Sequence, residues 1–414
     1  MSAQELIAAA KAASHKLGLA TTSQKDNALI ELARLLPLNA ERILFANEID
    51  LAKGVAEGMA IGLQDRLRLT SARIESLAAA LTQVAGLTDP IGEIVREINH
   101  PNGLNIIEKR VPFGVIGAIY EARPNVTVDL ASLAIKTGNA IVLRGGTAAE
   151  NTNKVLVELI REALSNAGLD PHAVQSVDEF GRLGAVAMMQ AVGLIDVLIP
   201  RGSANLIHTV VNEAKVPVIQ TGDGIVHVFI DATADAQMAI DIVNNSKTQR
   251  PSVCNSLETL LVHRDAAARI LPALFENLHG AGVIIHGDHD SAQFAEYVMP
   301  ATETDWATEY LSLKISVKIV DNLDEAIAHI AKYSTAHTES IITNDQANAE
   351  RFLNEVDSAV VMVNASTRFT DGGEFGFGAE VGISTQKLHA RGPMGLTELT
   401  STKWLVRGQG QTRK

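Results

Sequence analysis

Apolar side chains recur at intervals of three and four through residues 2–88, for example at Leu29, Leu32 and Leu36. Residues at this spacing share one face of a helix, so the pattern predicts an all-helical entry segment. Between residues 93 and 112 the pattern changes to two short β-type runs, joined by the turn-prone sequence HPNG. Two such runs predict a β-hairpin, and their polar character indicates an arm.

From residue 113 onward, short apolar runs alternate with helical stretches, and the alternation starts again after Asp231. This alternation predicts parallel sheets, because parallel strands need a crossover that is usually a helix. We therefore expect an α/β fold with two parallel-sheet domains and a small β-arm. The expected strands are VIGAIY, AIVLR, DVLIP, PVIQ and VHVFID, followed by ETLLVH, GVIIH, ISVKIV, ESIITN and AVVMV. Helices are expected at 148–166, 180–191, 264–279, 323–332 and 345–354.

The composition is that of a globular α/β protein, because 46% of the 414 residues are hydrophobic, 20% are charged and 4% are aromatic. The formal net charge of -13 argues against non-specific nucleic-acid binding, which needs a basic face. No apolar run reaches the roughly 18 residues of a membrane span, and the N-terminal sequence does not have the pattern of a signal peptide. Cys254 is the one cysteine, so an intramolecular disulfide is excluded and we expect a cytoplasmic location.

The densest group of reactive side chains is NNSKTQRPSVCNSLE, at residues 244–258. Lys247 and Arg250 precede Cys254 by seven and four residues, and Pro251 breaks any helix between them. Nearby cations favour the thiolate, which is the nucleophilic form of cysteine. Two interpretations stay open on these residues alone, a catalytic thiol and a small buried side chain.

A second group lies in residues 111–146, which read as strand, loop, helix and strand. Asn125 is placed where catalytic groups collect on open α/β sheets, and its amide could donate to a developing oxyanion. The alternative is that Asn125 only caps the following helix. Arg144 ends the second strand and precedes Gly145, and it could either bind a cofactor or lie at the surface.

A third group is IPRGSANLIHTVV, in which a strand runs into Gly202 and Ser203 and then into a helix. Small residues at such a point let a phosphate or a cofactor approach the backbone. No G-x-G-x-x-G motif is present, so a standard Rossmann fingerprint does not support dinucleotide binding. The histidines are scattered without the spacing of metal ligands, and we expect no metal site.

Taken together, these motifs resemble those of the gamma-glutamyl phosphate reductases, a branch of the aldehyde dehydrogenase superfamily. The resemblance covers essentially the whole chain and rests on VPFGVIGAIYEARPNV, LRGG, IPRGS, KTQRPSVCN and FGAEVGISTQKLHARGPMGL. It implies NADPH-dependent reduction of L-glutamyl 5-phosphate to glutamate 5-semialdehyde with release of phosphate, in proline biosynthesis. It also implies a homo-oligomer, and a complex with the upstream glutamate kinase is a further expectation.

The same resemblance suggests a role for each part of the chain. We expect residues 1–96 and 113–230 to form a cofactor-binding domain. Residues 231–397 would form a catalytic domain whose last part returns to the first domain. The segments 97–112 and 398–414 would form an oligomerisation arm.

Individual roles follow from the positions that match the motifs. Cys254 is the implied nucleophile, and the Asn125 amide with the Cys254 backbone N–H would hold the oxyanion of each tetrahedral species. Arg144 stands where relatives place a lysine against the adenosine ribose, and a guanidinium suits the 2′-phosphate of NADPH. Glu309 aligns with the glutamate that holds the nicotinamide ribose, although a solvated loop glutamate is the competing reading. Gly145, Gly202 and Ser203 complete the expected cofactor contacts.

The substrate of these reductases carries a phosphate and a carboxylate, which favour guanidinium partners. The candidates near the motifs are Arg250, Lys247, Arg123, Arg201 and Arg391. Gln220 stands where hydrolytic aldehyde dehydrogenases carry a general-base glutamate, and an amide cannot take a proton from water. Two alternatives remain, another semialdehyde oxidoreductase of this superfamily and a catalytically silent homologue that acts in assembly.

Overall fold

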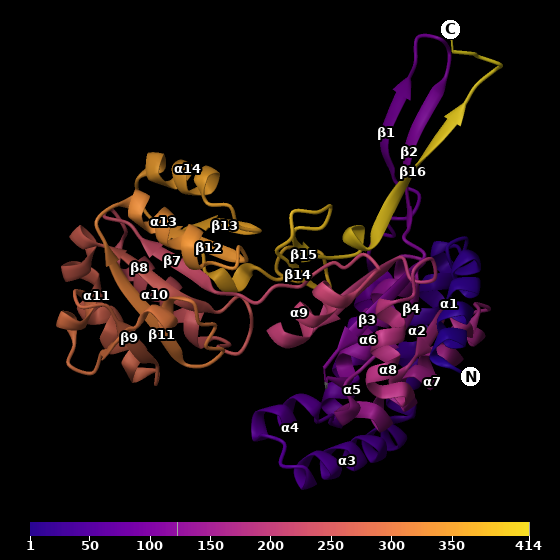
Figure 1. Ribbon diagram of the computed structural model, residues 1–414, viewed down its shortest axis with the longest axis horizontal. Helices are drawn as coiled ribbons and strands as arrows, with labels where there is room; N and C mark the ends of the chain where they lie inside the picture. The colour runs from indigo at the N-terminus through magenta and orange to yellow at the C-terminus, as the bar shows by residue number, and fades with distance from the viewer. Residues whose placement is uncertain (122, 414) are drawn as a thin grey trace. The chain divides into compact units, whose positions relative to one another are not determined.

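The computed structural model describes residues 1–121 and 123–413, and the chain divides into two compact units (Figure 1). The first unit contains Met1–Gln220, Gly376–Gly382 and Met394–Lys414. The second contains Thr221–Phe375 and Ile383–Pro393. No helix among the described residues is both long and apolar enough to cross a membrane.

The expected helical entry segment is present in the first unit. Its helices are α1 (Ala3–Leu17), α2 (Thr22–Leu38), α3 (Ala40–Ala56), α4 (Ile61–Leu67) and α5 (Ser71–Gly86). Capping boxes fix the starts of α1 and α2, because Ser2 and Thr21 each exchange hydrogen bonds with the residue three positions later. The apolar positions that predicted these helices, such as Leu29, Leu32 and Leu36, are buried.

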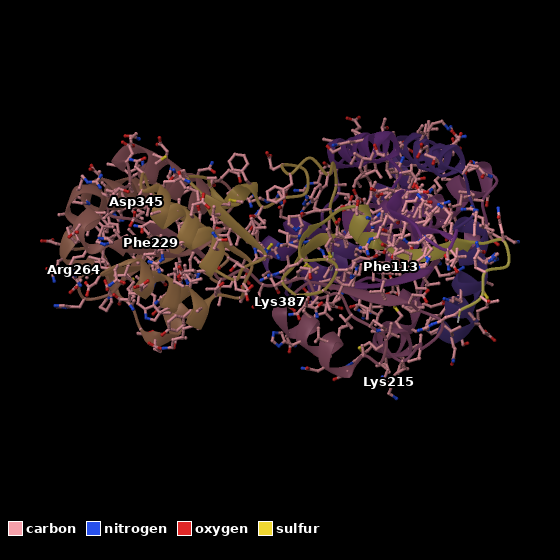
Figure 2. The ribbon with its side chains drawn as sticks, turned by 90° about the horizontal axis from the view of Figure 1, so that it is seen from above. Phe113, Lys215, Phe229, Arg264, Asp345 and Lys387 are labelled. Carbon is pink, nitrogen blue, oxygen red and sulfur yellow. The ribbon has the colours of Figure 1, made fainter. Side chains whose placement is uncertain are left out.

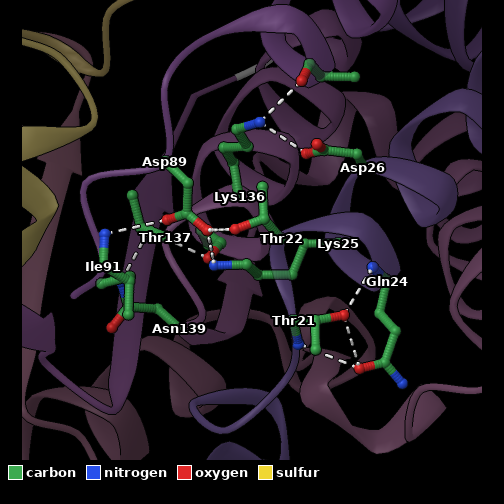
Figure 3. A network of polar contacts seen from close by, with 12 residues as sticks. Thr21, Thr22, Gln24, Lys25, Asp26, Asp89, Ile91, Lys136, Thr137 and Asn139 are labelled. Carbon is green, nitrogen blue, oxygen red and sulfur yellow. Dashed lines mark hydrogen bonds and ion pairs between the residues drawn. The ribbon is translucent and has the colours of Figure 1, made fainter.

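Two buried lysines hold α2 against its neighbours (Figure 3). The ammonium of Lys25 lies 2.6 Å from the Asp89 carboxylate, and both side chains are buried. Lys136 donates to Asp26 on α2 at 2.6 Å and to the carbonyl of Ala85 on α5 at 2.7 Å. Burial alone would raise the pKa of Asp89, but hydrogen bonds from Lys25, Thr22 and the backbone outweigh it and lower this pKa. The two ion pairs therefore fix the helices to one another.

The first unit also contains the first parallel sheet. Its strands are β3 (Val115–Tyr120), β4 (Ala140–Arg144), β5 (Val174–Ser176) and β6 (Val197–Arg201), in the order β5-β4-β3-β6. All neighbouring pairs are parallel, as the alternating pattern predicted. The connecting helices are α6 (Pro124–Lys136), α7 (Glu150–Asn166) and α8 (Gly181–Met189), and α9 (Ala204–Glu213) follows β6.

The predicted hairpin forms an antiparallel sheet with the C-terminal strand. β1 (Ile94–Asn99) pairs with β2 (Asn105–Pro112), and β2 pairs with β16 (Thr400–Arg407) over its full length. A turn around Gly103, whose φ is +89°, closes the hairpin. We call these three strands the arm. Apolar side chains on the arm stay exposed, including Ile94, Trp404 and Val406.

The second unit contains a larger parallel sheet in the order β10-β9-β11-β8-β7-β12-β13. Its strands are β7 (Val226–Ile230), β8 (Leu257–His263), β9 (Ile284–Gly287), β10 (Met299–Pro300), β11 (Lys314–Val320), β12 (Thr338–Ile342) and β13 (Val360–Val363). The helices are α10 (Ala236–Thr248), α11 (Arg264–Gly280), α12 (Glu303–Trp306), α13 (Leu323–Tyr333) and α14 (Gln346–Glu355). Phe229 lies in the interior and Arg264 at the surface (Figure 2).

Short segments complete the chain. The 3₁₀ turns are η1 (Thr147–Ala149), η2 (Pro171–Ala173), η3 (Asp178–Phe180), η4 (Ser291–Phe294), η5 (Thr367–Phe369) and η6 (Thr397–Leu399). The strands β14 (Gly382–Ser384) and β15 (Gly392–Met394) pair with each other.

Two details differ from the sequence expectations. The boundary between the units lies after Gln220 and not after residue 230, because β7 pairs with β8 and β12 in the second sheet. The run PVIQ makes no strand of its own, since only Val218 forms an isolated bridge, with Leu198. Both errors arise because an apolar run does not reveal which sheet it joins.

Candidate active site

Cys254 lies on the irregular segment between α10 and β8, in the second unit. The side chain is partly exposed, so it is not sealed inside an apolar core. Lys247, near the end of α10, donates to the carbonyl of Leu257 at 2.8 Å and to the Glu258 carboxylate at 2.9 Å. These bonds join the helix to the first residues of β8, so both ends of the segment that carries Cys254 are fixed.

The placement of Lys247 corrects a prediction. Its side chain is completely buried, and so is that of Glu258, so the ammonium is not available to a substrate. Burial raises the pKa of Glu258 and lowers the pKa of Lys247, because both ions lose hydration, while each opposes the other's shift through its charge. The pair is therefore structural, and loss of either partner would leave an uncompensated buried charge.

The backbone of Cys254 is in unusually close contact with Gly224. A β-carbon added to Gly224 would lie only 1.6 Å from the carbonyl oxygen of Cys254. The N–H of Gly224 donates to the carboxylate of Glu309 at 2.7 Å. Glu309 is thus not a solvated loop residue: it is partly buried, and burial is the main reason that its pKa is raised. Glycine is required at position 224, since any side chain would displace the segment that carries the thiol.

A cation that sequence reasoning missed lies beside the same segment. Arg368 on η5 donates through Nε to the side-chain oxygen of Gln249 at 2.8 Å. Burial lowers its pKa, charge from Asp371 and Cys254 raises it, and Arg250 lowers it further. Through Gln249, Arg368 is therefore attached to the residue that precedes Arg250, in the segment that leads to Cys254.

In the first unit, Asn125 is the second residue of helix α6 and does not cap it. The N-cap is Arg123, whose side chain makes no capping bond, and Pro124 is the first helical residue. The Asn125 amide donates to Asp129 at 3.0 Å. Burial raises the pKa of Asp129 to about 6, against the Asn125 hydrogen bond and the charge of Arg201, which lower it. The helix-cap alternative is thus wrong, and Asp129 fixes the orientation of the amide.

Arg144 and Gly145 are organised by Asp178. The Gly145 N–H donates to Asp178 at 2.7 Å, and Arg144 lies near enough to lower the pKa of this carboxyl, which burial raises overall. Arg144 Nε donates to the Gly181 carbonyl at 3.3 Å. An added β-carbon at Gly145 would lie 2.1 Å from the Asn153 amide nitrogen, so only glycine fits here.

Gly202 and Ser203 precede helix α9, and the donors of Ser203 are bonded to Glu121. The backbone N–H and the hydroxyl of Ser203 lie 3.0 and 2.6 Å from the two Glu121 oxygens. A carboxylate therefore takes the position that an anion prefers at a helix start. The donor set of this turn suits a phosphate, which would replace Glu121.

The predicted residues thus form separate groups within the two units. Cys254, Arg250 and Glu309 belong to the second unit, together with the newly found Arg368 and Gly224. Arg391 also lies there and pairs with Asp357 at 2.7 Å. Asn125, Arg123, Arg144, Gly145, Arg201, Gly202 and Ser203 belong to the first.

Comparison with known proteins identifies the family of this chain. The model of the aldehyde dehydrogenase family matches residues 1–293. Gamma-glutamyl phosphate reductase of Clavibacter michiganensis is 60% identical over 410 residues, which cover 99% of this chain and 95% of that protein. The crystal structure of the Thermotoga maritima gamma-glutamyl phosphate reductase is 46% identical, has a TM-score of 0.98 and covers both chains completely.

A second structure shares the fold alone. It is an engineered glycolyl-CoA reductase with bound NADP⁺, 16% identical, with a TM-score of 0.68 over 98% of this chain and 96% of that one. The fold and these matches define an oxidoreductase of the aldehyde dehydrogenase type, a class that uses a nicotinamide cofactor. The chain belongs to the aldehyde dehydrogenase family and, within it, to the gamma-glutamyl phosphate reductases.

Replacing Gly224 by alanine tests the contact with Cys254. We expect Gly224→Ala to lower kcat by at least about tenfold, because a misplacement of the nucleophile near 1 Å has such costs. The matched control is Gly280→Ala at the end of α11, where a β-carbon would meet nothing within 4 Å. Both variants are assayed for turnover and for thermal unfolding. Equal activity of the two variants would show that the close contact does not position the thiol.

Proposed function

We propose that this chain reduces L-glutamyl 5-phosphate to L-glutamate 5-semialdehyde, with NADPH as the reductant and Cys254 as the covalent nucleophile. The reaction is the second step of proline biosynthesis from glutamate. The family relationship supports the substrate and the reaction type. The observation that carries the proposal is Cys254 itself, a partly exposed cysteine on a polar segment that hydrogen bonds of Lys247 and Thr367 hold in place.

The reaction divides into two steps at the sulfur atom. The Cys254 thiolate attacks the acyl carbon, the bond from this carbon to the phosphate oxygen breaks, and the phosphate leaves with the electron pair. The amide of Asn125 and the backbone N–H of Cys254 donate to the oxyanion of each tetrahedral species. When bound, a nicotinamide cofactor would supply the hydride that reduces the resulting thioester to a thiohemiacetal. Collapse of the thiohemiacetal on Cys254 then releases the aldehyde and the thiolate.

Residues of the first unit fit the cofactor. Arg144 has the fork geometry that a 2′-phosphate accepts, and Gly145 brings the backbone of the β4 turn next to it. Gly202 and Ser203 offer a helix start whose donors already bind a carboxylate. In the second unit, Glu309 is the proposed partner of the nicotinamide ribose. The hydrogen bond from the Gly224 N–H would hold its carboxylate in place for this role. The arginines at 123, 201, 250 and 391 are the remaining candidates for the substrate's anionic groups.

The covalent mechanism predicts the behaviour of Cys254→Ser. Oxidation of glutamate semialdehyde by NADP⁺ and phosphate should fall by about 10³-fold or more, because a hydroxyl is a far weaker nucleophile here. The unfolding temperature should stay near that of the unchanged protein. The assay follows NADPH absorbance with and without phosphate. If the unchanged protein oxidised the semialdehyde to the free acid without phosphate, the alternative of a hydrolytic semialdehyde dehydrogenase would replace this proposal.

The preference for NADPH is tested at Arg144. Arg144→Gln removes a charge-assisted contact, so KM for NADPH should rise by about tenfold to a hundredfold, whereas KM for NADH should change little. Arg161→Gln, at a partly exposed position of α7, is the control and should leave both values unchanged. An equal rise for the two cofactors would rule out contact with the 2′-phosphate.

The arm is the proposed surface for homo-oligomer assembly. Its strand β1 is exposed over its whole length, and Trp404 and Val406 on β16 are also exposed. Deleting residues 398–414 removes β16 and should lower the mass per particle measured by light scattering. An unchanged mass would show that subunits assemble through another surface.

A further inference from the structure

Arg368 is a cation beside the nucleophile that no motif had indicated. We propose that Arg368, together with Arg250, binds the phosphate group that leaves the acyl carbon and, in the reverse reaction, the inorganic phosphate that attacks the thioester. This inference rests on the proposed function and adds to it the site of the departing group.

The position of Arg368 is fixed from both ends of the Cys254 segment. Its Nε bonds to Gln249, which directly follows α10. The hydroxyl of the preceding residue, Thr367, donates to the carbonyl of Asn255 at 2.8 Å, and the Asn255 amide donates to the carbonyl of Thr370 at 2.7 Å. The turn that carries Arg368 is therefore attached directly to the residue that follows the nucleophile.

The arrangement of charged groups around Arg368 is compatible with the binding of an anion. Its side chain is partly buried, and this burial lowers its pKa, while the neighbouring guanidinium of Arg250 adds repulsion. Its Nε donates to the neutral amide oxygen of Gln249, and the carboxylates of Asp371 and Glu374 act on the guanidinium through their charge. By contrast, Arg391 pairs with Asp357, and Arg351 pairs with both Asp324 and Glu355. An anion beside both Arg368 and Arg250 would relieve their repulsion.

The distance of each substrate anion from the reacting carbon decides which one is bound. The phosphate is attached to this carbon through one oxygen, whereas the α-carboxylate lies at the opposite end of the substrate. Because hydrogen bonds attach Arg368 to Gln249 and the preceding Thr367 to Asn255, the turn that carries Arg368 is held beside the segment whose thiolate attacks the acyl carbon. Arg368 is therefore placed for the phosphate, and bidentate hydrogen bonds suit this group.

Binding the phosphate at this point helps the step in both directions. In reduction, the carbon–oxygen bond breaks and the electron pair stays on the phosphate, whose added negative charge the two guanidinium groups stabilise. This step is a substitution and not a reduction. The Cys254 sulfur forms the new bond to the acyl carbon and becomes the thioester sulfur. In oxidation, the same groups hold inorganic phosphate while its oxygen attacks the thioester and the thiolate leaves.

Steady-state kinetics in the oxidative direction provide the first test. With the full chain, NADP⁺ and glutamate semialdehyde, Arg368→Gln should raise KM for inorganic phosphate by about tenfold to a hundredfold. KM for the semialdehyde and KM for NADP⁺ should stay within about twofold of the values for the unchanged protein, because Arg368 contacts neither ligand in this proposal. Arg368→Lys keeps the charge without the fork and should give an intermediate KM for phosphate. The control is Arg351→Gln, which removes a surface arginine of the same unit.

Alkylation of the single cysteine provides a second test that needs no turnover. Iodoacetamide reacts with the thiolate, so its rate reports on Cys254 alone. Inorganic phosphate should slow this reaction in the unchanged protein and in Arg351→Gln, but not in Arg368→Gln. The pH midpoint of alkylation should also rise in Arg368→Gln, because the thiolate loses a neighbouring cation.

The results that would overturn the phosphate site differ from the result that would overturn the proposed function. An unchanged phosphate KM in Arg368→Gln, or equal protection by phosphate in this variant and the unchanged protein, would overturn the phosphate site. A rise in KM for the semialdehyde alone would assign Arg368 to the α-carboxylate instead and would also overturn it. If the unchanged protein failed to oxidise glutamate semialdehyde at any phosphate concentration, the proposed function would be wrong.

Discussion

The buried ion pair between Lys247 and Glu258 is the interaction on which the reactive segment depends. One ammonium bonds the carbonyl of Leu257 and the carboxylate of the next residue, so α10 and β8 are joined across a short irregular connection. Replacing such a pair by well-packed apolar groups can be neutral, whereas losing one partner costs about 3–5 kcal/mol. The value of the pair here is geometric, since it fixes where the connection that holds Cys254 begins and ends.

Carboxylates of the first unit hold three of its proposed anion-binding donors. Asp129 accepts from Asn125, Asp178 accepts from Gly145, and Glu121 accepts from Ser203. Donors that are already oriented lose little conformational entropy when a ligand arrives. The three cases differ in one respect. Asp129 and Asp178 are partly buried with raised pKa values and therefore act as supports, whereas Glu121 is exposed and can be exchanged for a phosphate.

Hydrophobic periodicity predicted most of the fold, because it depends only on residues that are close together in the sequence. The helical entry segment, the hairpin and the strands β3, β4, β8 and β11 all follow from which positions within a short window are apolar. The assignment of VHVFID to the first domain failed because β7 pairs with β8 and β12, and strand partners are chosen by contacts distant in sequence. The run PVIQ joins the first sheet only through one isolated bridge between Val218 and Leu198, because periodicity does not reveal how far a pairing extends.

In the candidate site, contacts between residues distant in sequence also decide the positions of single side chains. Proximity in sequence to Cys254 suggested Lys247, yet seven residues of helix and turn bring its ammonium into the interior, against Glu258. A charged residue in the second position of the apolar strand LETLLVH was the signal available for this pair, because a buried carboxylate needs a partner. Arg368 is more than one hundred residues from the thiol in sequence, and hydrogen bonds from Thr367 and Asn255 bring it there. Sequence motifs therefore point to the candidate nucleophile, whereas the tertiary structure determines which cations lie near its segment.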